Sequence, residues 1–184
     1  MMVVPRFCPG CAAPLRRRRL PPHGRLHPCC SQCGFVHFDN PAPCVGVVIA
    51  CPARGVLLAR RGVAPFRGRW DIVGGFMEGG EHPEEAALRE VREETGLTVV
   101  LHRMLGIWMD RYGRRPGHTM NIVYEAGIVS GEPVADDDVA ELQWFQPVSI
   151  PLERMAFDNC RRGLEAWLRL RPSDVACDAM QIKS

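Results

Sequence analysis

The residues best placed to do chemistry in this sequence are three glutamates at helical spacing. Glu90, Glu93 and Glu94 lie within residues 83–95, which are predicted to form a helix because proline suits its first position and Gly96 its C-terminal end. At about 100° per residue, the three side chains fall within an arc of about 100°. Carboxylates on one face repel each other, and a divalent cation removes the repulsion. Such oxygen ligands suit Mg²⁺ or Mn²⁺, with substrate phosphate oxygens completing the shell.

The neighbours of these glutamates favour the same chemistry. Arg89 lies one turn before Glu93 and can hold that carboxylate in place. Gly74 and Gly75 allow the backbone to turn sharply and to approach a metal closely. An apolar stripe beside the acidic face can dock the helix on a sheet, and it consists of Ala87, Leu88, Val91 and Thr95. The glutamates alone leave a second interpretation open, a solvated acidic face without a ligand.

A second candidate metal site lies near the N-terminus. Two Cys-x2-Cys pairs are separated by eighteen residues, the spacing of a zinc ribbon, and they comprise Cys8, Cys11, Cys30 and Cys33. Four thiolates would close a tetrahedral Zn²⁺ site and stabilise a segment that is too polar to build a core. Cys29 could compete with its neighbour, but the two-residue spacer to Cys33 favours Cys30. Free or oxidised thiols are the alternative.

The chain divides at a stiff linker, Asn40 to Pro43. Residues 1–40 show no clear helical or strand period and are expected to be the ribbon. Residues 41–172 are expected to form a catalytic α/β domain, and residues 173–184 a disordered tail. Within the domain, apolar runs predict strands at 44–51, 56–60 and 70–73, with further strands within 98–109, 120–130 and 142–145. A second helix is predicted at 157–170.

The charge and composition of the chain limit which kinds of partner are expected. The net charge of +2 implies no polyanion partner, so nucleic acid is not expected. The run Arg16–Arg19 could contact nucleic acid, but a solvated loop is the favoured interpretation. No stretch of eighteen apolar residues and no signal peptide is found, so the default compartment is cytoplasmic. The oligomeric state stays open, a homodimer included.

The segment from Gly75 to Leu97 resembles the Nudix box, G-x5-E-x7-R-E-U-x-E-E-x-G-U, at every fixed position. The resemblance covers about residues 44–170 and implies an α/β/α sandwich on a mixed sheet. It implies hydrolysis of a pyrophosphate by water attack at phosphorus. By position, Glu90, Glu93 and Glu94 would be Mg²⁺ or Mn²⁺ ligands. Gly75 would offer its carbonyl to a metal, and Arg89 would orient Glu93.

The general base is less closely specified by the resemblance. In the family it is a glutamate of the box or one from a later loop, and Glu141 stands where a later glutamate often falls. A solvated loop residue is the alternative for Glu141. Val73 occupies a position where many members have proline, with no loss of chemistry expected.

The arrangement of ribbon and Nudix domain resembles NADH pyrophosphatases and zinc-ribbon members that act on ADP-ribose or FAD. The S-Q-P-W-P-F-P stretch of the NADH enzymes is missing from residues 97–130, which places NADH behind ADP-ribose and FAD. An oxidised nucleoside triphosphate hydrolase, a nucleotide-sensing regulator and an RNA-decapping enzyme are the alternatives. Aromatic residues that could stack on a nucleobase are Phe66, Trp70, Trp108, Tyr112 and Tyr124, with Trp70 and Trp108 favoured as core or pocket wall.

Overall fold

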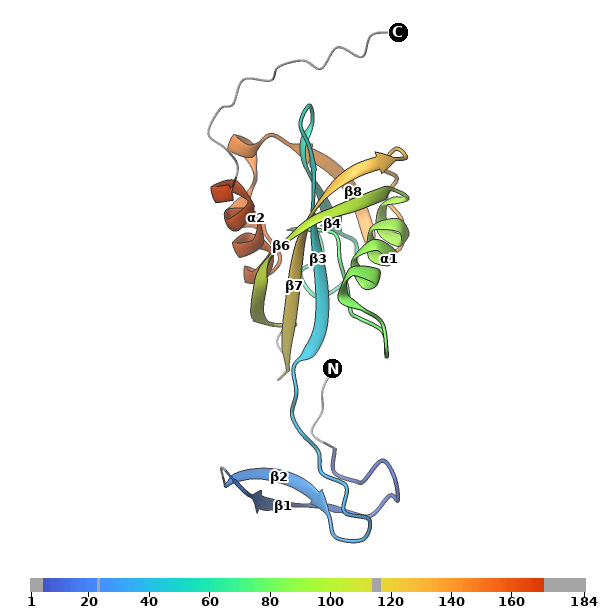
Figure 1. Cartoon of the computed structure of the whole chain (residues 1–184), viewed down its shortest axis with the longest axis vertical. Coiled ribbons are helices and arrows are strands. Elements are labelled where there is room, and N and C mark those ends of the chain that lie inside the picture. The colour runs from blue at the N-terminus through green and yellow to red at the C-terminus, as the bar shows by residue number, and fades with distance from the viewer. Residues whose placement is uncertain (1–4, 23, 114–116, 171–184) are drawn as a thin grey trace.

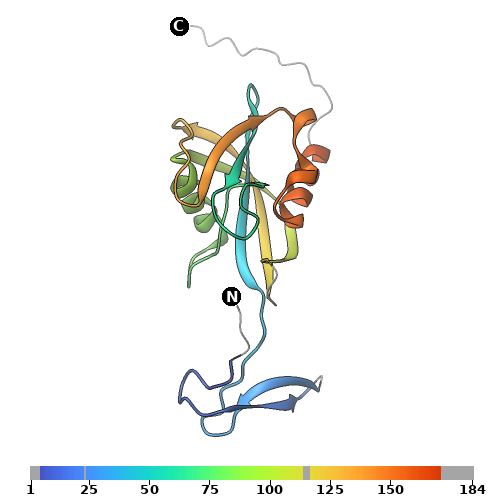
Figure 2. The same ribbon diagram turned by 180° about the vertical axis from the view of Figure 1, so that it is seen from behind.

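The computed structural model describes residues 5–22, 24–113 and 117–170, so the predicted tail at 173–184 lies outside the described residues. Figures 1 and 2 show an N-terminal hairpin set apart from an α/β body, to which it is joined at the start of β3. The elements are β1 (Leu15–Leu20), β2 (Arg25–Cys30), β3 (Ala42–Cys51), β4 (Gly55–Arg61), β5 (Trp70–Asp71), α1 (Pro83–Thr95), β6 (Thr98–Arg111), β7 (His118–Ser130), β8 (Val139–Phe145), two short 3-10 turns (Pro147–Ser149 and Leu152–Arg154) and α2 (Asp158–Leu170).

The body is the expected α/β/α sandwich on a mixed sheet. Its strands run in the order β5-β4-β3-β7-β6, and β8 also pairs with β4. The pair β3–β7 is parallel, whereas the other pairs are antiparallel. Helices α1 and α2 cover opposite faces of this sheet (Figure 1). Strand β3 therefore lies in the middle of the sheet, with one helix on each of its two faces.

The continuous apolar sequence of β3 follows from this central place. Val45, Val47 and Ile49 pack on the α1 side, in one core with Val91. Val48 points to the other face and packs with α2 residues such as Leu164. Successive side chains of a strand alternate between faces, so a strand that is covered on both faces needs apolar residues at every position.

Helix α1 has the predicted bounds because both ends are capped. The Nδ1 atom of His82 accepts a hydrogen bond from the Glu84 amide, and the Glu85 carboxylate accepts one from the His82 amide. Gly96 closes the other end in the left-handed conformation, with φ of 68°. The apolar stripe differs in one residue from the prediction, since Leu88 is 42% exposed and the fully buried Ala86 takes its place.

The N-terminal region contains two strands although its sequence shows no strand period, and Arg16–Arg19 lie in one of them and not in the predicted loop. Strands β1 and β2 make an antiparallel hairpin in which Arg16 pairs with Cys29 and Arg19 with Leu26. The arginines are exposed whichever way they point. A two-stranded hairpin with only a small buried cluster does not need alternating apolar residues, and so its sequence carries no strand period. Among the described residues, no helix is both long enough and apolar enough to cross a membrane.

Candidate active site

The backbone of Gly74 and Gly75 is held against β3. The amide of Val47 donates to the carbonyl of Val73 and the amide of Val45 to that of Gly75, at 2.8 and 2.9 Å. A Cβ at Gly74 would lie 2.2 Å from the Val45 carbonyl oxygen, and its φ of 153° also favours glycine. The Gly-Gly pair thus brings the strand end against both β3 and helix α1.

Arg89 binds several carboxylates of the acidic face at once. Its guanidinium donates to both carboxylate oxygens of Glu81, at 2.8 and 3.0 Å. The same group reaches Glu90 at 2.8 Å and Glu93 at 2.9 Å, and it also donates to the Phe76 carbonyl. This fork lowers the pKa of Glu81 to about 2. The predicted contact between Arg89 and Glu93 is therefore present, and Glu81 is an additional partner.

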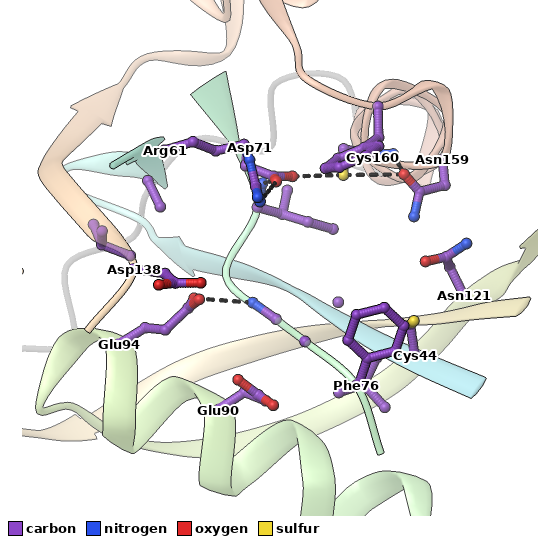
Figure 3. A pocket seen from close by; sticks show the side chains of 18 of the residues that line it. Cys44, Arg61, Asp71, Phe76, Glu90, Glu94, Asn121, Asp138, Asn159 and Cys160 are labelled. Atoms are coloured by element: carbon purple, nitrogen blue, oxygen red, sulfur yellow. Dashed lines mark hydrogen bonds and ion pairs between the residues drawn. The ribbon is translucent and has the colours of Figure 1, made fainter. Parts of the chain in front are cut away.

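Glu90 and Glu94 lie deeper in the same cleft (Figure 3). Burial raises the pKa of Glu94 to about 8, although its carboxylate accepts a 3.1 Å hydrogen bond from the Gly74 amide. Burial also raises the pKa of Glu90, against the lowering effect of Arg89. Both shifts have one main physical cause, which is that burial disfavours the charged form of a carboxylate.

This donor set fits a divalent cation. Glu90, Glu93 and Glu94 all line the cleft, so the structure brings the predicted ligands to one wall. Their oxygens do not all lie within 4.8 Å of one another, and of the described residues the cysteine quartet alone forms such a compact group of ligands. Carboxylates spread along a wall suit Mg²⁺, which keeps several water molecules and shares its shell with phosphate.

Glu141 lies apart from this wall. It belongs to β8, where its carboxylate pairs with Arg60 at 3.1 Å and is 45% exposed, and it is not among the residues that line the cleft. Asp138, just before β8, does line the cleft and lies beside Glu94 in Figure 3. The sequence offered no signal to single out Asp138, because it stands in a run of three aspartates.

The opposite wall holds a buried polar cluster that sequence reasoning missed. The Cys160 thiol donates to Asp71 across 2.7 Å, and Arg61 binds the second oxygen of Asp71 at 3.1 Å. Burial raises the pKa of Asp71 and raises that of Cys160 well above its usual value. Asn121 and Asn159 line the cleft next to this cluster (Figure 3). A charged residue inside the apolar strand at 70–73 was the available signal.

Aromatic side chains gather around the cleft. Tyr112 stacks on Phe157 at 5.6 Å with an interplanar angle of 13°, and Phe76 meets Tyr112 edge-on at 5.3 Å. All three line the cleft. Of the residues predicted to stack on a base, Tyr112 is therefore in position, and Phe66 contacts Phe157. The other three belong to the two cores, where Trp70 and Tyr124 are buried and Trp108 packs against the α2 side.

The four predicted cysteines converge in the ribbon. Their sulfur atoms lie within 4.8 Å of one another, and Cys8 and Cys33 are 3.4 Å apart. All four are free thiols. The Cys29 thiol instead donates to the His27 carbonyl and lies outside the group, which contains the predicted Cys30. A tetrahedron with Zn–S bonds of about 2.3 Å has sulfur atoms about 3.8 Å apart, so the quartet fits zinc.

The glutamate-bearing helix α1, residues of α2 and the strand ends of an α/β/α sandwich line one cleft, an arrangement that suits a hydrolase of phosphoric anhydrides. The NUDIX domain model matches residues 40–168, and the chain belongs to the Nudix family.

Two relatives and one solved structure illustrate the likeness. An ADP-ribose pyrophosphatase from Methanocaldococcus jannaschii is 34% identical over 73% of this chain and 70% of its own length. An NAD-capped RNA hydrolase NudC from Pseudomonas aeruginosa is 32% identical over 79% of this chain, which spans about half of that relative. A NUDIX hydrolase from Nitrosomonas europaea has a TM-score of 0.78 at 24% identity, over 90% of this chain and 92% of that one.

Proposed function

We propose that the protein hydrolyses the pyrophosphate of a nucleoside diphosphate linked to X, with ADP-ribose or FAD as the favoured substrate and NADH behind them. One observation carries this proposal, which is that a single cleft contains both the box glutamates and the aromatic group Phe76, Tyr112 and Phe157. The carboxylates can serve the phosphates while the rings hold a base. Pyrophosphate chemistry needs positioning and charge neutralisation more than covalent help, so X can vary.

Glu90, Glu93 and Glu94 would hold Mg²⁺ or Mn²⁺, together with the Gly75 carbonyl. That carbonyl already accepts a hydrogen bond from Val45, and its second lone pair is available. When bound, the cation would neutralise the phosphates and acidify a water molecule. Arg89 acts as a positioning residue, because one guanidinium fixes both Glu90 and Glu93.

The substrate order has support from the comparisons as well as the cleft. The relative from Methanocaldococcus jannaschii, of which the chain covers 70%, is named for ADP-ribose. The stretch typical of NADH pyrophosphatases is missing after the box. ADP-ribose should give AMP and ribose 5-phosphate, and in ¹⁸O water one product phosphate should carry label. Label in neither product would exclude water attack at phosphorus.

A substrate screen with Mg²⁺ or Mn²⁺ tests the order directly. ADP-ribose, FAD and NADH would be compared with an oxidised deoxynucleoside triphosphate by kcat/KM. A value for the triphosphate more than tenfold above the other three would overturn the proposal and indicate cleaning of the nucleotide pool. Absence of turnover with every substrate would favour the nucleotide-sensing alternative.

The role of the carboxylates is tested by Glu93→Gln, with Glu84→Gln as the matched control on the same helix. Loss of a ligand or base should lower kcat at least about a hundredfold. The fold should survive, because the Glu93 side chain is 50% exposed. Turnover of Glu93→Gln within threefold of the parent protein would contradict the assignment. Glu84 is exposed and its variant should keep full activity.

The general base is proposed to be a box glutamate or a carboxylate near β8. Glu141→Gln and Asp138→Asn separate the two candidates outside the helix. The contacts of Asp138 with the cleft favour a larger loss for Asp138→Asn, of about tenfold or more in kcat. A large loss for Glu141→Gln alone would restore the sequence-based prediction.

We further propose that Cys8, Cys11, Cys30 and Cys33 bind one structural Zn²⁺. Elemental analysis should find one zinc per purified chain. Full zinc content in a Cys8→Ser/Cys30→Ser variant would refute the ligand set.

A further inference from the structure

The net charge of +2 hides two regions of opposite sign. The first 40 residues contain six arginines and one acidic residue, Asp39, a net charge of +5. The other residues contain seventeen basic and twenty acidic side chains, a net charge of −3. Four thiolates with one Zn²⁺ would still leave the ribbon at +3. The overall charge of +2 therefore does not exclude a polyanion partner of the ribbon, because this value averages over two regions of opposite sign.

The ribbon arginines also lack acidic partners. Within the described part of the chain, every ion pair lies between residues 54 and 165, where Arg54, Arg103 and Arg162 each bind a carboxylate. Arg16–Arg19 are all exposed, and among the described residues the only side-chain hydrogen bond that they form is from Arg19 to the carbonyl of Gly24. Positive charge is thus concentrated and uncompensated on the hairpin.

The pleat of β1 spaces this charge regularly. Arg16 and Arg18 project to one face and Arg17 and Arg19 to the other, and Arg25 stands opposite Leu20 on the neighbouring strand. Side chains two residues apart on a strand are separated by about 7 Å, which is on the scale of the distance between successive phosphates of a single strand. The guanidinium fork suits phosphate oxygens.

Aromatic groups accompany the arginines. A groove on the ribbon is lined by Arg17, Arg25, His27 and Phe38, and the last two rings contact each other at 5.0 Å. The ribbon is too small to cover the ring of Phe38, which is 54% exposed. His37 lines the same groove, and its buried Nε2 atom has no hydrogen-bond partner among the described residues. Cationic side chains next to exposed rings are typical of surfaces on which bases stack.

We propose that the β1–β2 hairpin binds single-stranded nucleic acid, with arginines on the phosphates and Phe38 against a base. Residues 37–41, which join the ribbon to the catalytic domain, span at most about 18 Å. Nucleic acid bound to the hairpin would therefore stay close to the cleft, which Cys44 of β3 lines. The inference does not depend on the proposed substrate, since it concerns binding by a separate surface.

The test is fluorescence anisotropy with labelled U20 RNA and the full-length, zinc-loaded protein at several salt concentrations. Replacing all four residues Arg16–Arg19 with Gln should weaken binding at least tenfold near 0.1 M salt. It should also reduce the slope of log K against log salt by about 0.7 for each lost phosphate contact. The matched control replaces four exposed arginines of the catalytic domain, Arg103, Arg154, Arg162 and Arg169, and should stay within threefold of the parent.

Additional measurements distinguish nucleic-acid binding from loss of the ribbon fold and from general binding of anions. Zinc content and circular dichroism show whether the Gln variant keeps its ribbon, and an Arg16–Arg19→Lys variant, which keeps the charge, should retain most of the salt slope. Binding of dT20 as tight as that of U20 supports the shared single-strand chemistry. Absence of RNA binding by the parent, or equal losses in the control, would overturn it. Equal affinity for polyglutamate of matched charge would also overturn it and indicate an acidic protein partner.

Discussion

The burial of Glu94 predicts that the metal-free protein loses stability as pH rises through the neutral range. The pKa of Glu94 is raised to about 8 in the folded state, mainly by burial, against about 4.5 in an unfolded chain. The folded state therefore holds a proton that the unfolded state has released. Stability falls with pH wherever the folded state binds more protons, so the loss should extend from about pH 4.5 to pH 8.

The size of the effect follows from these two values. A difference of one bound proton between the folded and unfolded states changes the free energy of unfolding by about 1.4 kcal/mol per pH unit. Between pH 5.5 and 7.5, Glu94 accounts for most of one such proton. The free energy of unfolding should fall by about 2 kcal/mol over that interval, a large fraction of the stability of a small domain. The raised pKa values of Glu90 and Asp71 act in the same direction. The pKa of Glu81, lowered to about 2, affects stability only in more acidic solution.

Urea unfolding at pH 5.5, 6.5 and 7.5 measures this loss, in magnesium-free buffer prepared with a chelating resin so that tightly held zinc stays. Glu94→Gln cannot titrate, so it should flatten the dependence and be more stable than the parent at pH 7.5. Added Mg²⁺ needs the carboxylate form and should restore the parent at pH 7.5 but not the variant. Constant or rising stability of the metal-free parent from pH 5.5 to 7.5 would refute the reasoning.

Three further predictions concern the site and the ribbon. Gly75→Ala would place a Cβ 2.5 Å from a carboxylate oxygen of Glu90, so kcat/KM should fall at least about a hundredfold. The control Gly79→Ala has open space around the new Cβ, so its kcat/KM should be unchanged. Equal activities of the two variants would contradict the predicted crowding at Gly75. Arg89→Lys keeps the charge but loses the fork, and it should lower kcat tenfold or more while KM changes little, a split that steady-state kinetics would show. Cys8→Ser should cost zinc and expose residues 1–40 to protease, with the catalytic domain left intact on gels.

Helix α1 and strand β3 could be predicted from the sequence because two independent signals agree in each. Proline and glycine mark both ends of α1, and its carboxylates recur at helical spacing inside those ends. An unbroken apolar run of strand length, followed by a turn, marks β3. The cysteine quartet is similar, since the two-residue spacer to Cys33 favours Cys30 over Cys29 and the four predicted sulfur atoms lie together. In all three cases the signal is local in the chain.

The rest of the site depends on contacts that no local pattern encodes. Cys160 and Asp71 are 89 residues apart, and only the packing of α2 on the sheet brings the thiol to the carboxylate. Glu141 shows the same limit at the scale of one strand. Its register opposite Arg60 turns it toward that arginine, and a shift of one residue would have reversed the face. Asp138 lines the cleft because the chain enters β8 there.

The charge balance of the cleft connects its stability with its chemistry. One guanidinium, that of Arg89, binds Glu81, Glu90 and Glu93, whereas the one hydrogen bond that Glu94 accepts from the described residues comes from the Gly74 backbone amide. Burial raises the pKa of Glu90 and Glu94, and the shortage of positive charge leaves the shift uncompensated, which disfavours the metal-free fold at neutral pH. The same shortage is what a divalent cation relieves. A variant that supplied a second basic group beside Glu94 would be more stable without metal, and it would bind Mg²⁺ less tightly for the same reason.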